Sequence, residues 1–65
     1  QSAGQFIRNY RLNTARELLL KNRETKQMNI AEIAYEVGFN DPKYFARCFS
    51  KQFNTTPSAL LNEEE

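Results

Sequence analysis

The apolar residues in the first third of the chain fall on two sides of a predicted helix. The stretch from about Ala3 to Lys21 contains no proline and is rich in Arg, Leu, Glu and Ala, and Ser2 and Gln5 have the spacing of a capping box. With ~3.6 residues per turn, two apolar groups lie on roughly opposite sides of this helix: Phe6, Ile7 and Tyr10 near its start, and Leu12, Ala15, Leu18 and Leu19 further along. Because a surface helix of one domain has a single apolar face, the pattern predicts a helix that packs against different partners at its two ends.

A polar stretch, Asn22 to Met28, is predicted to be a loop, and a short amphipathic helix follows it. Asn29 and Glu32 again have capping-box spacing. Apolar residues then recur with the spacing typical of a two-turn helix; they are Ile30, Ile33, Ala34 and Val37. Gly38 stands where the end of a helix favours a residue that can take a positive φ.

A second short helix, over about 42–53, is predicted by Asp41-Pro42, an N-cap residue followed by proline at the first helical position. Its apolar arc contains Phe45, Cys48, Phe49 and Phe53, and its opposite side contains Lys43, Arg47 and Ser50. Thr56-Pro57 predicts a closing helix through Leu61. Two short helices joined by a tight glycine-containing turn are typical of a helix-turn-helix. We therefore predict an all-α fold, a homeodomain-like three-helix unit preceded by a long helix.

The net charge of +1, from nine Lys+Arg and eight Asp+Glu, conceals local patches of charge. Residues 1–26 carry six basic and two acidic side chains, and residues 42–53 carry three basic and no acidic ones. The other six acidic residues lie in 27–41 and in 63–65. With no His and one Cys, the chain lacks the usual zinc ligands and the usual general base. We therefore expect neither an enzyme nor a metal or cofactor site.

The basic face of the second short helix suits DNA, because this helix of a helix-turn-helix enters the major groove by its first turns. Lys43 and Arg47, one turn apart, can donate to O6 and N7 of guanine. Tyr44 can reach a phosphate or a thymine methyl, Ala46 can add an apolar contact, and Lys51 is better placed for a phosphate. The preceding helix can offer backbone N–H groups of its own N-terminus to a phosphate.

Each of these residues also has a plain structural interpretation. Lys43, Arg47 and Lys51 can be a solvated face, and a tyrosine such as Tyr44 is more often a half-buried packing residue. Asp41 is fully explained as an N-cap. The alternative function is a small helical protein-interaction module that uses the same basic face against an acidic partner.

The stretch from Ile30 to Phe53, followed by Thr56-Pro57, resembles the signature of the AraC/XylS family of bacterial transcription regulators. Upstream, Phe6-Ile7, Arg11-Leu12, Ala15 and Leu18-Leu19 match the linker helix of that family, so the resemblance covers nearly the whole chain. The resemblance implies sequence-specific binding of double-stranded DNA. The implied base or backbone contacts are Lys43, Tyr44, Ala46 and Arg47, with Asn40 nearby. From this resemblance together with the positions of the other residues in the two helices, we expect backbone contacts at Asn29, Ile30, Asn40, Ser50 and Lys51.

The resemblance also implies a division of the chain into a linker helix at 1–22, the second of two helix-turn-helix units at 23–62 and an acidic tail at 63–65. The first unit would precede this chain and cover Phe6, Ile7 and Tyr10; without it we expect self-association through these residues. Asn54 replaces the glycine usual in the family, and we expect its left-handed turn to survive because Asn tolerates that geometry. Leu60-Leu61 replaces an aromatic-arginine pair, so the phosphate contact of that arginine is missing.

For the full-length protein, the resemblance implies a contact with RNA polymerase and a cytoplasmic location in a bacterium. A tethered protein is expected instead if the chain closes a hybrid two-component sensor. No apolar run approaches the ~18 residues of a membrane span, so we expect no membrane contact from this part.

Overall fold

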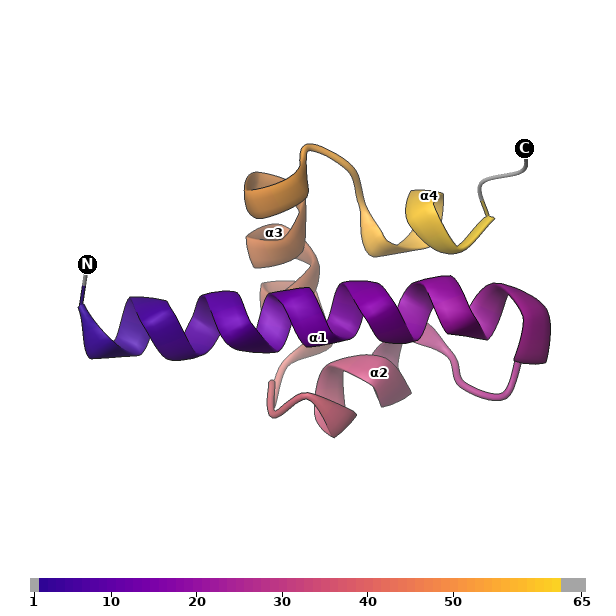
Figure 1. The fold of residues 1–65 in the computed structure, drawn as a ribbon, viewed down its shortest axis with the longest axis horizontal. Helices are drawn as coiled ribbons and strands as arrows, with labels where there is room; N and C mark the ends of the chain where they lie inside the picture. The colour runs from indigo at the N-terminus through magenta and orange to yellow at the C-terminus, as the bar shows by residue number, and fades with distance from the viewer. Residues whose placement is uncertain (1, 63–65) are drawn as a thin grey trace.

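The computed structural model describes residues 2–62, which form four helices and no strand. The long helix α1 (Ala3–Thr25) runs the length of the molecule, and α2 (Ile30–Glu36), α3 (Pro42–Phe53) and α4 (Pro57–Asn62) follow it (Figure 1). The predicted all-α fold is therefore confirmed, and the glutamate tail lies outside the described residues. Within residues 2–62, no helix is long and apolar enough to cross a membrane.

The end of α1 differs from the sequence prediction, because the helix continues to Thr25 where a loop was predicted from Asn22. Asn22 is only 4% exposed. Its side-chain oxygen accepts the backbone N–H groups of Gln27 at 2.9 Å and Met28 at 3.0 Å, and its amide nitrogen donates to the Met28 carbonyl. The polar composition of this stretch indicated a loop, but Asn22 instead holds the following loop against the helix. The helix then ends at Lys26, whose φ is 53°.

The predicted caps of the shorter helices are confirmed. The Asn29 side chain accepts the backbone N–H of Glu32 at 2.8 Å, and the Glu32 carboxylate accepts the N–H of Asn29 at 2.9 Å, so both bonds of the capping box form. Asp41 caps α3 by accepting a backbone N–H at 2.9 Å. Gly38 and Asn54 have φ values of 103° and 57°, the left-handed geometry that the sequence predicted for both.

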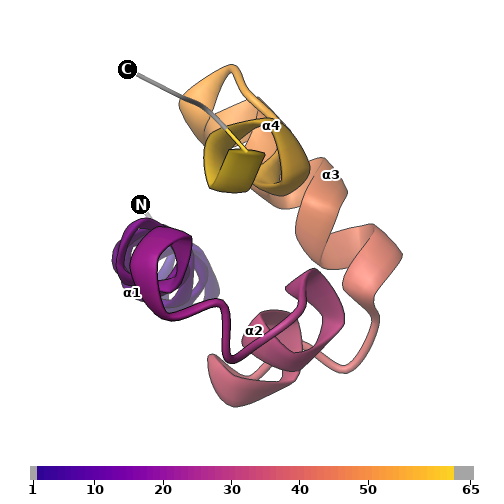
Figure 2. The same cartoon turned by 90° about the vertical axis from the view of Figure 1, so that its right-hand side faces the viewer.

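The core lies where α2, α3 and α4 gather on one side of α1, as the view along α1 shows (Figure 2), and it begins at Leu12 of that helix. A chain of aromatic contacts runs through it, with ring centroids 5.3 Å apart for Phe39 and Phe45, and 5.7 Å apart for Phe45 and Phe49. Phe53, predicted to be core, is partly buried and packs 4.7 Å from Phe49. The buried apolar residues are Leu12, Ala15, Leu19, Ile33, Ala34, Val37, Phe39, Phe45, Phe49 and Leu60.

The N-terminal end of α1 projects beyond the other helices (Figure 1). It begins at Ser2, whose hydroxyl caps the helix by accepting the N–H of Gln5 at 3.1 Å. Phe6, Ile7 and Tyr10 are 65%, 48% and 67% exposed. Of the other apolar group, Leu12, Ala15 and Leu19 are buried and Leu18 is partly buried. The two groups thus lie in different surroundings, and the packing of Phe6, Ile7 and Tyr10 against a partner stays a prediction.

Candidate nucleic-acid interface

Helix α3 presents a basic face to solvent because its opposite face anchors it in the core. Phe45 and Phe49 are fully buried, whereas Lys43 and Arg47 are exposed one turn apart on the other side. The Asp41 cap fixes where the helix begins. The two basic side chains therefore project from the first two turns of a helix whose position is set by buried aromatic rings.

The turn between α2 and α3 fixes the angle between the two helices. The N–H of Gly38 donates to the carbonyl of Tyr35 at 3.1 Å, and the N–H of Phe39 donates to the carbonyl of Ala34 at 2.9 Å. These bonds close the end of α2, and Phe39, 6% exposed, then packs against Phe45. The turn is thus tied to the core at both ends, which is the arrangement of a helix-turn-helix.

Tyr44 lies at the edge of the basic face, where α3 meets α1. Its ring centroid is 6.0 Å from that of Phe39, yet the residue is 44% exposed. Its hydroxyl accepts a hydrogen bond from Nη1 of Arg8 at 3.4 Å. Tyr44 therefore packs against Phe39 while much of the residue stays exposed. The packing interpretation is observed, and a contact of Tyr44 with DNA stays a prediction.

The other predicted contact residues on and before α3 lie on or beside the same face. Asn40 and Lys51 are exposed, whereas Ala46 and Ser50 are partly buried. The Ser50 carbonyl accepts the N–H of Asn54 at 2.9 Å, so its backbone is engaged in ending the helix. Lys43, Tyr44 and Arg47 are consequently the best exposed of the predicted base contacts.

Asn29 and Ile30 lie apart from this group, at the start of α2. The Asn29 N–H already donates to the Glu32 carboxylate, and Ile30 is partly buried against the core. A carboxylate at this position repels a phosphate, so the capping box disfavours the backbone contact that the sequence predicted for Asn29.

Two arginines from α1 that the sequence prediction did not include also lie beside α3. Arg8 contacts Tyr44, and Nη1 of Arg11 donates to the carbonyl of Gly38 at 3.4 Å. Both line a groove of about 760 Å³ between α1 and the turn, together with Asn40 and Tyr44. These contacts join residues 27 and 36 positions apart, so no local pattern signals them.

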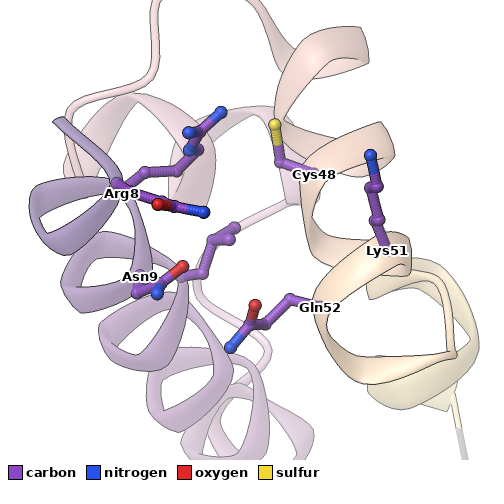
Figure 3. Close-up of a pocket in the computed structure, with 7 residues that line it drawn as sticks. Arg8, Asn9, Cys48, Lys51 and Gln52 are labelled. Carbon is purple, nitrogen blue, oxygen red and sulfur yellow. The ribbon is translucent and has the colours of Figure 1, made fainter. Parts of the chain in front are cut away.

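A smaller pocket of about 210 Å³ lies between α1 and α3 (Figure 3). Arg8 and Asn9 extend into it from α1, and Cys48, Lys51 and Gln52 come from α3. Cys48 is partly buried at its wall and packs against the core, in keeping with its predicted place on the apolar face. Within residues 2–62, no cluster of His, Cys, Asp or Glu could hold a metal ion.

Comparison with known proteins gives a match over nearly the whole chain. A family model described as a helix-turn-helix domain matches residues 1–63. The chain is 50% identical over 58 residues to a histidine kinase of Formosa agariphila, which is 89% of this chain and 4% of that protein. It is 39% identical over 56 residues to the transcriptional activator RhrA of Rhizobium meliloti, covering 86% of this chain and 17% of the activator.

A probable transcription factor of Proteus vulgaris, PqrA, is 40% identical over 55 residues, which cover 85% of this chain and 42% of that protein. The chain therefore spans less than half the length of each of these three relatives. No solved structure gives a significant match.

Proposed function

Because the chain belongs to the AraC/XylS family of helix-turn-helix domains, we propose that it binds double-stranded DNA as part of the DNA-binding domain of a transcription regulator. The observation that carries the proposal is α3, a helix anchored by buried Phe45 and Phe49 with Lys43 and Arg47 exposed on its outer face. A helix so presented enters the major groove by its N-terminal turns. The family is one of binding domains, which points away from catalysis.

In the proposed complex Arg47 donates to O6 and N7 of a guanine, since its fork of donors matches that edge. Lys43 donates to a neighbouring base, and Tyr44 and Ala46 make apolar or phosphate contacts at the same edge. Asn40, Ser50 and Lys51 lie at the ends of this surface, where the DNA backbone passes. The exposure of Lys43, Tyr44 and Arg47 on one side of α3 supports these roles.

Selection of binding sites from random-sequence duplexes, followed by variants of α3, tests the proposal. Arg47→Ala is expected to relax base preference at one position by about 1–3 kcal/mol. Lys51→Ala, the control on the same helix, is expected to weaken binding evenly across sequences and reduce the salt slope by about 0.9. If no sequence motif emerges and an acidic protein binds the basic face instead, α3 belongs to a protein-interaction module.

For the longer protein we infer a regulator that also contacts RNA polymerase, a role supported by the name of the transcriptional activator to which the chain is similar. In that protein residues 1–22 would act as the linker helix and residues 23–62 as the second helix-turn-helix unit, although α1 extends to Thr25. Transcription in vitro with purified polymerase tests the contact: a full-length protein that occupies its site without changing transcription or polymerase binding contradicts it.

The exposed apolar group on α1 supports a docking surface for another helix-turn-helix unit of the longer protein. Phe6 and Tyr10 are each about two-thirds exposed, and exposed apolar patches favour association. In the isolated chain the same residues would drive self-association. Sedimentation equilibrium tests the self-association. A concentration-dependent dimer should revert to a monomer in the double variant Phe6→Ser–Tyr10→Ser, and a strict monomer of the unaltered chain contradicts the self-association.

A further inference from the structure

Arg8 and Arg11 lie one turn apart on α1, beside the start of α3. Nη1 of Arg8 donates to the Tyr44 hydroxyl and Nη1 of Arg11 to the Gly38 carbonyl, each at 3.4 Å. Both line the groove of about 760 Å³ that also contains Asn40 and Tyr44. Tyr44 belongs both to this groove and to the basic face of α3. The groove therefore extends the predicted DNA-contact surface of α3 onto α1.

The two guanidinium groups have no ion-pair partner within residues 2–62, where their hydrogen-bond partners are a phenol oxygen and a backbone carbonyl. Asp41 also lines the groove and keeps its negative charge while it caps α3, so the groove has two cations and one carboxylate and stays net positive. A guanidinium has five N–H donors, and both contacts are long. Unused donors on two adjacent cations favour an anion with several acceptor oxygens, and phosphate is the anion that arginine binds in a bidentate manner.

The position of the groove fits one DNA strand. When α3 lies in the major groove, the first helix of the motif, here α2, crosses the backbone on one side. Tyr44 marks the side of α3 that faces α1, since its hydroxyl meets Arg8. Building on the proposed DNA-binding function, we propose that Arg8 and Arg11 bind phosphates of the strand that passes on this side. The linker helix is then part of the DNA interface.

Salt dependence of binding separates a phosphate contact from other roles. The probe is a fluorescent mixed-sequence duplex, titrated with the chain between about 50 and 200 mM salt. Arg8→Gln and Arg11→Gln should each reduce the slope of log K against log salt by about 0.9, which corresponds to roughly 8-fold weaker binding at 0.1 M salt. Arg8→Lys and Arg11→Lys keep the charge and should preserve the slope.

Lys21→Gln is the matched control, because Lys21 is exposed on α1 and ~15 Å or more along the helix from Arg11. It removes the same charge and should leave the slope unchanged. An equal reduction in Lys21→Gln would overturn the proposal, because the effect would then follow net charge alone. Slopes that stay unchanged in both Arg→Gln variants would overturn it too, while leaving the proposed function intact. If the unaltered chain binds no duplex, the proposed function itself fails.

A purely structural role of the two arginines predicts a different result. If Arg8 and Arg11 only hold Tyr44 and the turn, the Gln variants should lower the melting temperature and alter base preference without changing the salt slope, and that result overturns the phosphate contact. Circular dichroism establishes that each variant is folded at the assay temperature. Gln and Arg have similar helix propensities; should one single variant unfold, the other carries the test.

Discussion

The two halves of α1 belong to one continuous helix but have opposite surroundings. In the C-terminal half, Ala15 and Leu19 are fully buried, because α2, α3 and α4 cover them. In the N-terminal half, Phe6 and Tyr10 are more than 60% exposed. Apolar residues occur in both halves, so hydrophobicity alone does not decide which half is buried. The difference lies in apolar cover: within residues 2–62 the other helices pack over Ala15 and Leu19, whereas Phe6 and Tyr10 stay exposed although Arg8 and Arg11 beside them make hydrogen bonds to Tyr44 and Gly38.

The largest expected effect on the free energy of unfolding tests this contrast by comparing Leu19→Ala with Ile7→Ala. Leu19 is fully buried and Ile7 is 48% exposed. Leu19→Ala should lower the free energy of unfolding by about 2–5 kcal/mol, a large share of the roughly 3–10 kcal/mol expected for a chain of this length. Ile7→Ala should change it by no more than about 0.5 kcal/mol. Denaturation followed by circular dichroism measures both.

Equal losses in the two variants would contradict the contrast. They would mean that the N-terminal half is also covered in solution, and a dependence of the Ile7→Ala effect on protein concentration would identify a second copy of the chain as the cover.

A smaller effect is expected at the polar residue that ends the buried half. Asn22→Ala leaves the Met28 carbonyl and the N–H groups of Gln27 and Met28 without their side-chain partner. The expected loss is about 1–3 kcal/mol of unfolding free energy, the cost of leaving partly buried polar groups unpaired. Asn13→Ala, at an exposed position of the same helix, should change stability by less than about 0.5 kcal/mol. A similar loss in both variants would show that the effect comes from replacing any Asn of α1, and not from the hydrogen bonds between Asn22 and the loop.

The elements that the sequence predicted correctly depend on neighbours a few residues apart. The capping box of Asn29 and Glu32, the Asp41 cap and the left-handed Gly38 and Asn54 all act within one turn. Their signals are therefore present in the local sequence, and so is the period that placed Phe45 and Phe49 inside and Lys43 outside.

The features that the sequence did not predict depend on distant contacts. Helix α1 extends past Asn22 because that side chain organises residues five and six positions ahead, and because Nε of Arg23 donates to the carbonyl of Leu60, 37 positions away, at 2.9 Å. The candidate interface shows the same limit. The helical spacing of residues in α3 predicted Arg47 on its exposed face, whereas Arg8 joins the interface only through a contact with Tyr44 on another helix.

The smallest expected effect concerns the left-handed residue at which the buried half of α1 ends. Lys26 has a φ of 53°, a conformation that costs an ordinary L-residue about 1–2 kcal/mol. Lys26→Gly removes that cost but adds about 0.4–1 kcal/mol of backbone entropy to the unfolded chain. The balance is a gain of about 0–1.6 kcal/mol in unfolding free energy. Asn54→Gly, the control at the other left-handed cap, should change it little because Asn already tolerates this geometry.

Denaturation of the two variants under the same conditions measures the difference. A gain for Lys26→Gly means that the loop, held by Asn22, imposes the left-handed geometry on an ill-suited side chain, as expected if burial fixes this end of α1. A loss larger than about 0.5 kcal/mol would mean that the Lys26 side chain itself stabilises the helix end, for example through the negative end of the helix dipole. The C-terminal half would then be stabilised by surface charge as well as by burial, and the contrast with the exposed half would be weaker than the core alone suggests.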